Sequence, residues 1–325
     1  GHSHIQAGTI PNCVAYDPCY TYEMAVIVQA GLKRMYEQRE NVFYYLTVMN
    51  EAYPQPAMPG YEVSEGGEPQ IDEQVVDGIL RGMYLLKPAS TNDKKTVRLL
   101  GSGTILREVL AAAELLEETY DVAAEVWSVT SFNELARNMH DVDRANLLDP
   151  LASAEQSFVQ ECLPGDVPVI AATDYIRAYA EQIRGHVAAD YRVLGTDGFG
   201  RSDTRDKLRH FFEVDRSFVA LAALIAGSPD PAHDREWRMM AASTGRSKTA
   251  TPSPTPSVAG VRPFGRDSTV PSSAPAGGPL AVRAAHHPSE LDAGLAAGIG
   301  RTASTDRPET DLVAHGSVPP GPFGL

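Results

Sequence analysis

The stretch KTVRLLGSGTILREVLAAAELLEETY, residues 95–120, decides the fold of this 325-residue chain. Its first part is an apolar run that ends in two closely spaced glycines, Gly101 and Gly103, which is typical of a strand that enters a tight turn. From Thr104 onward, apolar residues recur with the spacing of an amphipathic helix. These apolar positions are Ile105, Leu106, Val109, Leu110, Ala113 and Leu116. A buried strand that turns directly into a helix predicts an α/β protein.

The same alternation continues on both sides of this stretch. Strands are predicted at residues 11–17, 41–50, 95–103, 123–131, 167–174 and 191–200, where apolar runs indicate burial. Helices are predicted at residues 21–39, 104–120, 132–139, 175–187 and 202–212. Asp203 or Thr204 is expected to cap the first turn of the last of these helices. Because strands that alternate with helices form mainly parallel sheets, we expect such a sheet with helices on both faces.

The charge of the chain excludes two classes of partner. The formal net charge is −14 and lies entirely in residues 1–226, because residues 227–325 hold nine acidic and nine basic side chains. Nucleic acid and anionic membranes both require clustered lysine and arginine, so neither is an expected partner. The longest apolar run, residues 218–227, is shorter than the roughly 18 residues that span a bilayer. The three cysteines, Cys13, Cys19 and Cys162, fit reduced thiols in a cytoplasm better than a disulfide framework.

Composition also divides the chain into segments. Residues 51–70 hold four prolines and three glycines without periodicity, which is typical of an interdomain linker. Residues 227–325 hold fourteen of the 24 prolines and no tyrosine or cysteine. Such a segment cannot bury enough apolar surface to offset chain entropy, and we expect it to be disordered. The α/β domain is expected between these two segments.

The histidine pair at the start of the chain, His2 and His4, is the first candidate site. Imidazoles two residues apart in an extended segment point the same way and could bind a metal ion, with Cys13 as the nearest further ligand. Cys13 and Cys19 do not have zinc-ribbon spacing, which disfavours a metal site. The alternatives are a histidine pair in a loop and a histidine that contacts a substrate.

The turn at Gly101 and Gly103 is the second candidate. It resembles the start of a dinucleotide-binding fingerprint, whose glycines let a pyrophosphate approach a helix N-terminus. Leu106 stands where the third glycine or alanine would be, and Glu125 lies at the start rather than the end of its predicted strand. The spacing therefore favours a tight turn over a nucleotide site.

A later glycine-rich turn, residues 194–205, is the third candidate. Its charged side chains could bind an anion or pair with one another, and they are Asp197, Arg201, Asp203 and Arg205. A triad of Ser202, His210 and Asp215 can also be assembled, but no nucleophile elbow surrounds the serine. Ion pairs and helix caps are the favoured interpretation here.

Taken together, several segments point to one family. In order along the chain they are GHSHIQAGTIPNCVAYDPCYTYEMAVIVQAGLKRMY (1–36), ENVFYYLTVMNEAYPQPAMP (40–59), GSGTILREV (101–109), VWSVTSFNELAR (126–137), ATDYIRAYAEQIR (172–184) and YRVLGTDGFGRSDTRDKLRHFFEVD (191–215). They resemble the C-terminal third of the homodimeric type of pyruvate dehydrogenase E1 component, a thiamine-diphosphate-dependent member of the transketolase-like superfamily. The resemblance is nearly continuous over residues 1–226.

This resemblance implies a domain organisation. Residues 1–52 would be the end of the pyrimidine-binding domain, 53–69 a linker, and 70–226 a transketolase C-terminal-like α/β domain. The family is cytoplasmic and homodimeric, and it oxidatively decarboxylates pyruvate and reductively acetylates the lipoyl group of E2. Its partners would be the upstream E1 domains, a second E1 subunit, and the E2 dihydrolipoyl acetyltransferase with its lipoyl domain.

The resemblance also implies a site. His4 stands where the family has a histidine on the substrate side of the thiamine site, with His2 as the second choice. The implied role of this histidine is to hydrogen-bond the substrate or a covalent intermediate, and an imidazole suits proton transfer near neutral pH.

The sequence departs from the family at the cofactor anchors. The family binds Mg²⁺ and the diphosphate through a GDG motif and a later asparagine, and it uses a catalytic glutamate. The only Asp-Gly pairs here, Asp77-Gly78 in a helix and Asp197-Gly198 in the late turn, lack that context. We therefore expect this chain alone neither to bind thiamine diphosphate and Mg²⁺ nor to be active.

The second departure follows residue 226, where a proline-rich tail with eight arginines and one lysine replaces the helical finish of the family. An out-of-frame reading of GC-rich coding explains this tail, and a genuine disordered extension is the alternative. Two other functions stay open. One is a stand-alone, non-catalytic α/β module that binds a partner or a nucleotide through Gly101 and Gly103. The other is a different transketolase-like 2-oxo acid dehydrogenase.

Overall fold

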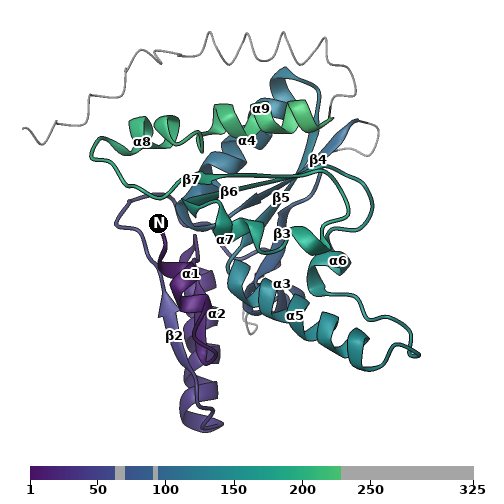
Figure 1. Ribbon diagram of the computed structural model, residues 1–325. Helices are drawn as coiled ribbons and strands as arrows, with labels where there is room; N and C mark the ends of the chain where they lie inside the picture. Colours follow the sequence, from purple (N-terminus) through teal and green to yellow (C-terminus); the bar gives the residue numbers. More distant parts are fainter. Residues whose placement is uncertain (63–69, 91–93, 228–325) are drawn as a thin grey trace, which may run out of the picture. The chain divides into compact units, whose positions relative to one another are not determined.

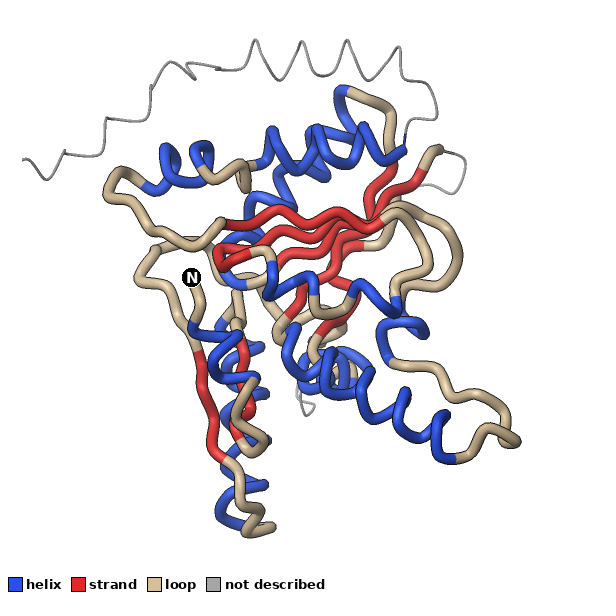
Figure 2. The backbone as a smooth tube through the Cα atoms, viewed as in Figure 1, coloured by secondary structure: helices blue, strands red, loops and turns tan. Residues whose placement is uncertain are grey.

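The computed structural model describes residues 1–62, 70–90 and 94–227, and a five-stranded sheet lies at its centre (Figures 1 and 2). The strand order is β3-β5-β4-β6-β7. The last four strands of this order are mutually parallel, and β3 is antiparallel to β5. The strands are β3 (Met83–Lys87), β4 (Thr96–Gly101), β5 (Ala123–Val129), β6 (Val169–Ile176) and β7 (Tyr191–Thr196). The predicted α/β fold with a mainly parallel sheet is confirmed.

Helices cover both faces of this sheet, because the strands are apolar on both faces (Figure 1). One face packs against α4 (Leu106–Thr119) and α9 (Arg216–Gly227). The other packs against α5 (Phe132–Leu148), α6 (Phe158–Cys162) and α7 (Ala178–Glu181). Successive residues alternate between the two cores, as the side-chain period of a strand requires. The alternating pairs are Leu99 and Leu100, Val126 and Trp127, and Ile170 and Ala171.

The first part of the chain forms a separate parallel strand pair. Its elements are α1 (Ser3–Gly8), β1 (Cys13–Tyr16), α2 (Thr21–Leu32) and β2 (Phe43–Leu46), and a π-helical turn, Lys33–Glu37, follows α2. The strands pair in parallel from Cys13 opposite Phe43 to Tyr16 opposite Leu46. The predicted strand–helix–strand unit is therefore confirmed.

Helix α3 (Glu73–Arg81) contains the Asp77-Gly78 pair, which was expected in a helix, whereas β3, the strand that follows it, was not predicted from the sequence. Asp72 begins the helix by accepting a hydrogen bond from the backbone N–H of Gln74, and Gly82, with φ of 115°, ends it. Val75 and Ile79 of α3 pack against β1 and α2. This apolar cluster joins the first part of the chain to the central sheet.

Two local expectations were wrong. The segment predicted as a buried strand, residues 41–50, forms β2, but Phe43 is 45% exposed because among the described strands β2 pairs only with β1. The helix predicted at residues 175–187 is short, because β6 continues to Ile176, which pairs with Thr196 of β7. Only α7 and a 3₁₀ turn, Arg184–His186, are helical in this region.

The expected cap of α8 (Arg205–Phe211) also differs. Thr204 occupies the cap position, but its side chain makes no capping hydrogen bond. The Asp203 carboxylate accepts the backbone N–H of Thr204 at 2.8 Å, one residue before the helix. Neither side chain therefore caps the first turn.

Parts of the predicted organisation lie outside the described residues. These parts are residues 63–69 of the predicted linker and 228–325 of the predicted tail. In the described part of the linker, residues 53–62, there is no helix or strand, apart from an isolated bridge between Glu62 and Gln70. Among the helices of residues 1–62, 70–90 and 94–227, none is long and apolar enough to cross a membrane.

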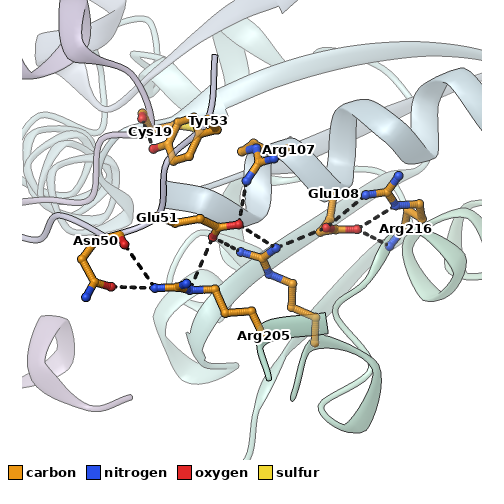
Figure 3. A network of polar contacts seen from close by, with 9 residues as sticks. Cys19, Asn50, Glu51, Tyr53, Arg107, Glu108, Arg205 and Arg216 are labelled. Carbon is orange, nitrogen blue, oxygen red and sulfur yellow. Dashed lines mark hydrogen bonds and ion pairs between the residues drawn. The ribbon is translucent and has the colours of Figure 1, made fainter. Parts of the chain in front are cut away.

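An ion-pair network ties the segment after β2 to α4, α8 and α9 (Figure 3). Glu51 accepts hydrogen bonds from Arg107 of α4 at 2.8 Å and from Arg209 of α8 at 2.6 Å. Glu108 of α4 accepts a hydrogen bond from Arg216, the first residue of α9, at 2.9 Å. Arg209 lies 3.4 Å from Glu108 and so joins the two carboxylates. Burial acts to raise the pKa of Glu108, but Arg216 and Arg209 outweigh it and hold that pKa below its usual value.

We predict that Glu108→Gln lowers the free energy of unfolding by about 2 kcal/mol, because Arg216 loses its buried counter-charge and Arg209 keeps only Glu51. The effect is expected above the unfolded-state pKa of 4.5, and it disappears as the pH falls through the lower folded-state pKa. Urea unfolding of the full chain at several pH values measures it. Glu114→Gln on the exposed side of the same helix is the matched control. Equal losses in the two variants would contradict the prediction.

Candidate active site

Helix α1 brings His4 into the interior. His2, immediately before the helix, already has helical backbone angles (φ −108°, ψ −9°), so the two histidines do not lie in the extended segment expected from the sequence. The His4 side chain is fully buried. Its ring stacks on Tyr179 at 4.7 Å between centroids and contacts Tyr175 and Tyr45 edge to face. His4 therefore lies in an aromatic enclosure, whereas His2 is exposed.

Two further side chains connect His4 to the central sheet. His4 Nε2 lies 2.9 Å from Thr47 Oγ1, and Thr47 Oγ1 donates a hydrogen bond to Asp17 Oδ1 at 2.7 Å. Asp17 follows β1, and its backbone N–H donates to the carbonyl of Thr130 after β5 at 2.7 Å. Its own carbonyl accepts the N–H of Gly103 at 3.0 Å. A continuous chain of hydrogen bonds thus runs from the imidazole to the turn before α4.

The burial of these groups shifts their titration. Burial lowers the pKa of His4 to about 4, so the imidazole is neutral near pH 7. Burial raises the pKa of Asp17 to about 7, although the hydrogen bond from Thr47 opposes the shift. Two atoms, His4 Nδ1 and Asp17 Oδ2, are buried without a hydrogen-bond partner in the described part of the chain. Unpaired buried polar atoms are unusual and commonly mark functional sites.

The glycine turn before α4 is a tight turn that surrounds Asp17. Gly103 has φ of +50°, and a Cβ added there would lie 2.6 Å from Asp17 Oδ2. The space in which a dinucleotide site would hold a pyrophosphate against the backbone thus contains a carboxylate. The favoured interpretation of the turn is confirmed, and this arrangement argues against a nucleotide site at Gly101 and Gly103.

His2 lies beside the late glycine-rich turn. A Cβ added to Gly198, where φ is +127°, would lie 3.5 Å from His2 Nε2. Phe199, the next residue, is 91% exposed. Two motifs that are far apart in the sequence therefore lie side by side at the N-terminal end of α1.

The charged residues of that turn do not pair with one another as expected. Arg205 donates to Asn50 at 2.6 Å, which extends the network of Figure 3. Arg201 lies over the ring of Phe211, 4.1 Å from its centroid. Asp203 lies 3.5 Å from Lys207 of α8. These charged side chains contact residues outside the turn, and they do not come together as an anion-binding cluster.

The other chemical candidates have structural explanations. His210 Nδ1 lies 2.8 Å from Asp215 Oδ2, but Asp215 also accepts backbone N–H groups of the first turn of α9. Ser202 is exposed in the preceding turn and takes no part in this contact. Within the described residues, no three histidine, cysteine, aspartate or glutamate side chains are grouped so as to hold a metal ion. Cys13, Cys19 and Cys162 are free thiols.

Sequence reasoning missed Thr47 and Asp17 as partners of His4. The signal was present: Asp17 ends one predicted strand, residues 11–17, and Thr47 lies in another, residues 41–50, and matching positions of neighbouring parallel strands lie side by side. The register places Tyr16 opposite Leu46, so Asp17 and Thr47 come next to each other. The missing information was that these two strands pair directly.

The sequence also did not reveal a histidine contact that joins buried Ser157, partly buried His186 and exposed Asp143. His186 Nδ1 lies 2.8 Å from Ser157 Oγ, and its Nε2 lies 3.0 Å from Asp143. Ser157 is fully buried and caps α6 through the N–H of Gln160. A pocket of about 280 Å³ lies beside His186. Because both ring nitrogens of His186 already have partners, this arrangement is structural.

Comparison with known proteins agrees with the fold of the α/β domain. Residues 82–215 match the transketolase-like C-terminal domain. Among solved structures, transketolase from Leishmania mexicana aligns with a TM-score of 0.44 at 16% identity, over 70% of this chain and 28% of that one. The family match over residues 82–215 assigns the α/β domain to the transketolase C-terminal class.

The first part of the chain gives the narrower assignment. Residues 1–56 match the middle domain of the pyruvate dehydrogenase E1 component. The E1 component of Pseudomonas aeruginosa is 55% identical over 228 residues, which is 70% of this chain and 24% of that protein. The E1 component of Escherichia coli K12 is 53% identical over 226 residues, 69% of this chain and 24% of that protein. The chain belongs to the family of pyruvate dehydrogenase E1 components and spans about a quarter of the length of these relatives.

We predict that His4 makes unfolding pH-dependent. Its folded-state pKa of about 4 is below the unfolded value of 6.5, so the unfolded chain binds the proton first. The contribution of His4 to the unfolding free energy is complete above pH 6.5 and is lost as the pH falls toward 4. This free energy changes by at most about 1.4 kcal/mol per pH unit. The unfolding free energy of the native chain minus that of His4→Gln should therefore shrink on acidification, as urea unfolding can measure.

The control for this measurement is His140→Gln, because His140 is exposed on α5. The unfolding free energy of the native chain minus that of His140→Gln should be constant over the same pH range. A constant difference for His4→Gln as well would show that His4 does not have the lowered pKa.

Proposed function

We propose that residues 1–226 act as the C-terminal part of a pyruvate dehydrogenase E1 component, with His4 on the substrate side of its thiamine diphosphate site. The observation that carries this proposal is the buried Nδ1 of His4. It belongs to a neutral imidazole, has no hydrogen-bond partner among the described residues, and occurs in a sequence 55% identical to an E1 component. His2, exposed beside the turn at Gly198, is the second candidate for contact with substrate.

The described residues suit one side of such a site. They include no side-chain group that could hold Mg²⁺, so a magnesium-bound diphosphate would be anchored by other parts of the enzyme. The enclosed imidazole suits the organic substrate, since a neutral ring can hydrogen-bond a carboxylate or carbonyl oxygen without a charge of its own. We infer that this chain binds the cofactor only together with the diphosphate-binding domain and a second E1 subunit.

In this assignment His4 would hold the substrate and exchange a proton at Nδ1. Tyr45, Tyr175 and Tyr179 surround the ring and would exclude water from it. Thiamine diphosphate, when bound, supplies the electron sink for decarboxylation of a 2-oxo acid. The acetyl group would then pass to the lipoyl domain of the E2 dihydrolipoyl acetyltransferase, in the cytoplasm.

A chimera tests the assignment. We predict that residues 1–226, exchanged for the matching region of the Pseudomonas aeruginosa E1 component, give an enzyme that decarboxylates pyruvate in preference to 2-oxoglutarate. His4→Gln in this chimera should lower kcat/KM for pyruvate by roughly 10²-fold or more, as expected for loss of a group that positions substrate and transfers a proton.

The matched control is His140→Gln, which should leave kcat/KM within about twofold, because an exposed residue outside special contacts has little effect. A folded chimera that prefers 2-oxoglutarate would assign the chain to another 2-oxo acid dehydrogenase. A folded, active chimera that tolerates His4→Gln would remove His4 from the site.

A further inference from the structure

The contacts of Thr47 restrict how protons can be arranged around His4. A threonine hydroxyl donates one hydrogen bond, and here its oxygen lies 2.7 Å from Asp17 Oδ1, 2.9 Å from His4 Nε2 and 3.4 Å from the carbonyl of Tyr16. The carbonyl contact is long, and the Tyr175 hydroxyl, which also hydrogen-bonds Thr47, can donate to it in either arrangement, so the carboxylate and the imidazole compete for the single threonine proton. If Thr47 donates its proton to one of these two groups, the other group must therefore donate a proton to Thr47.

Two arrangements satisfy these contacts. When Asp17 is ionised, Thr47 donates to Oδ1, and His4 must donate from Nε2–H, which leaves a lone pair on Nδ1. When Asp17 is protonated, it donates to Thr47 Oγ1, the threonine donates to Nε2, and the proton of the neutral ring is on Nδ1. The two arrangements differ by one proton. In passing from the first to the second, Nδ1 gains a proton, the Nε2 proton moves to Thr47, and the threonine proton moves to Asp17.

We propose that Thr47 and Asp17 are positioning residues that determine which ring nitrogen of His4 carries its proton, so that His4 exchanges a proton at Nδ1 while its ring stays neutral. The carboxyl group of Asp17 takes the change in charge, two hydrogen bonds away. The use of this relay on a substrate rests on the proposed function, whereas control of the tautomer does not.

The surroundings favour a neutral ring. His4 is fully buried, and the groups that face it from β2, β6 and α7 are the uncharged rings of Tyr45, Tyr175 and Tyr179. A cationic imidazole would lose its hydration there without a counter-charge in contact.

The surroundings of Asp17 favour a carboxyl group that titrates in the neutral range. Burial, with Asp174 of β6 and Glu23 of α2, raises the pKa of Asp17, and the hydroxyl groups of Thr47 and Ser102 oppose this shift. The pKa of about 7 lies near the pH at which such a relay would operate. The unpaired Oδ2 beside Gly103 gives the proton a second position on the same group.

Nitrogen NMR of the full chain, labelled with ¹⁵N-histidine, tests the proposal directly, because the two ring nitrogens report the tautomer. His4→Gln identifies the His4 signals among those of the nine histidines. We predict that the ring is neutral at every pH above the His4 pKa of about 4. Its proton should be on Nε2 above the pKa of Asp17 and increasingly on Nδ1 below that pKa. The midpoint should lie near pH 7, where Asp17 titrates.

Three variants separate the relay from a structural effect. Thr47→Val should abolish the pH dependence of the tautomer, and Thr47→Ser, which retains the hydroxyl, should preserve it. Thr130→Val is the matched control, because Thr130 is also buried but donates to the carbonyl of Ile79, outside the relay. It should leave the tautomer change intact.

A His4 tautomer that is independent of pH in the native chain would overturn the proposal, as would a change that survives Thr47→Val. These outcomes differ from a failure of the proposed function. The tautomer change can occur in a chain whose chimera is inactive, and an active chimera can lack it.

Discussion

The buried carboxylate of Asp17 is the constraint on which the rest of the site depends. Its backbone N–H and C=O bond to Thr130 and Gly103, and its side chain accepts from Thr47. These three contacts come from the ends of β5, β4 and β2. The first strand pair and the central sheet therefore meet at one residue. Gly103 must be a glycine here, because its φ is positive and a side chain would occupy the place of the carboxylate.

A second buried acid, Glu23, shows why Asp17 differs from an ordinary structural carboxylate. Glu23 accepts four hydrogen bonds, from the backbone N–H groups of Cys19 and Tyr20 and from the hydroxyls of Tyr84 and Ser128. Both of its oxygens are thus bonded, and the group fixes the start of α2 against β3 and β5. Asp17 has one oxygen bonded and one without a partner in the described residues. A buried acid that is incompletely bonded is the one suited to take up a proton.

The sequence predicted the parts of this arrangement that depend on local pattern. The strand, glycine turn and helix at residues 95–120 were recognisable because periodicity and glycine act over a few residues. His4 was proposed as a candidate site residue through its motif. Its partners were not, since the contact of Asp17 with Thr47 requires the register of β1 and β2, which a single strand does not encode. The helix predicted at residues 175–187 was too long for a similar reason, because pairing with β7 keeps Ile176 in a strand although its neighbours suit a helix.

Two histidines, the fully buried His4 and the partly buried His186, show what the structure adds to a motif. His186 and His4 both hydrogen-bond a hydroxyl group, and both would be plausible catalytic bases from composition alone. His186 has a partner on each ring nitrogen, Ser157 and Asp143, so neither nitrogen is available to a substrate. His4 has a partner on Nε2, whereas Nδ1 has none among the described residues. A ring fixed on one side and unbonded on the other can keep its orientation while it exchanges a proton, and this asymmetry is the reason for proposing a chemical role for His4 and a structural one for His186.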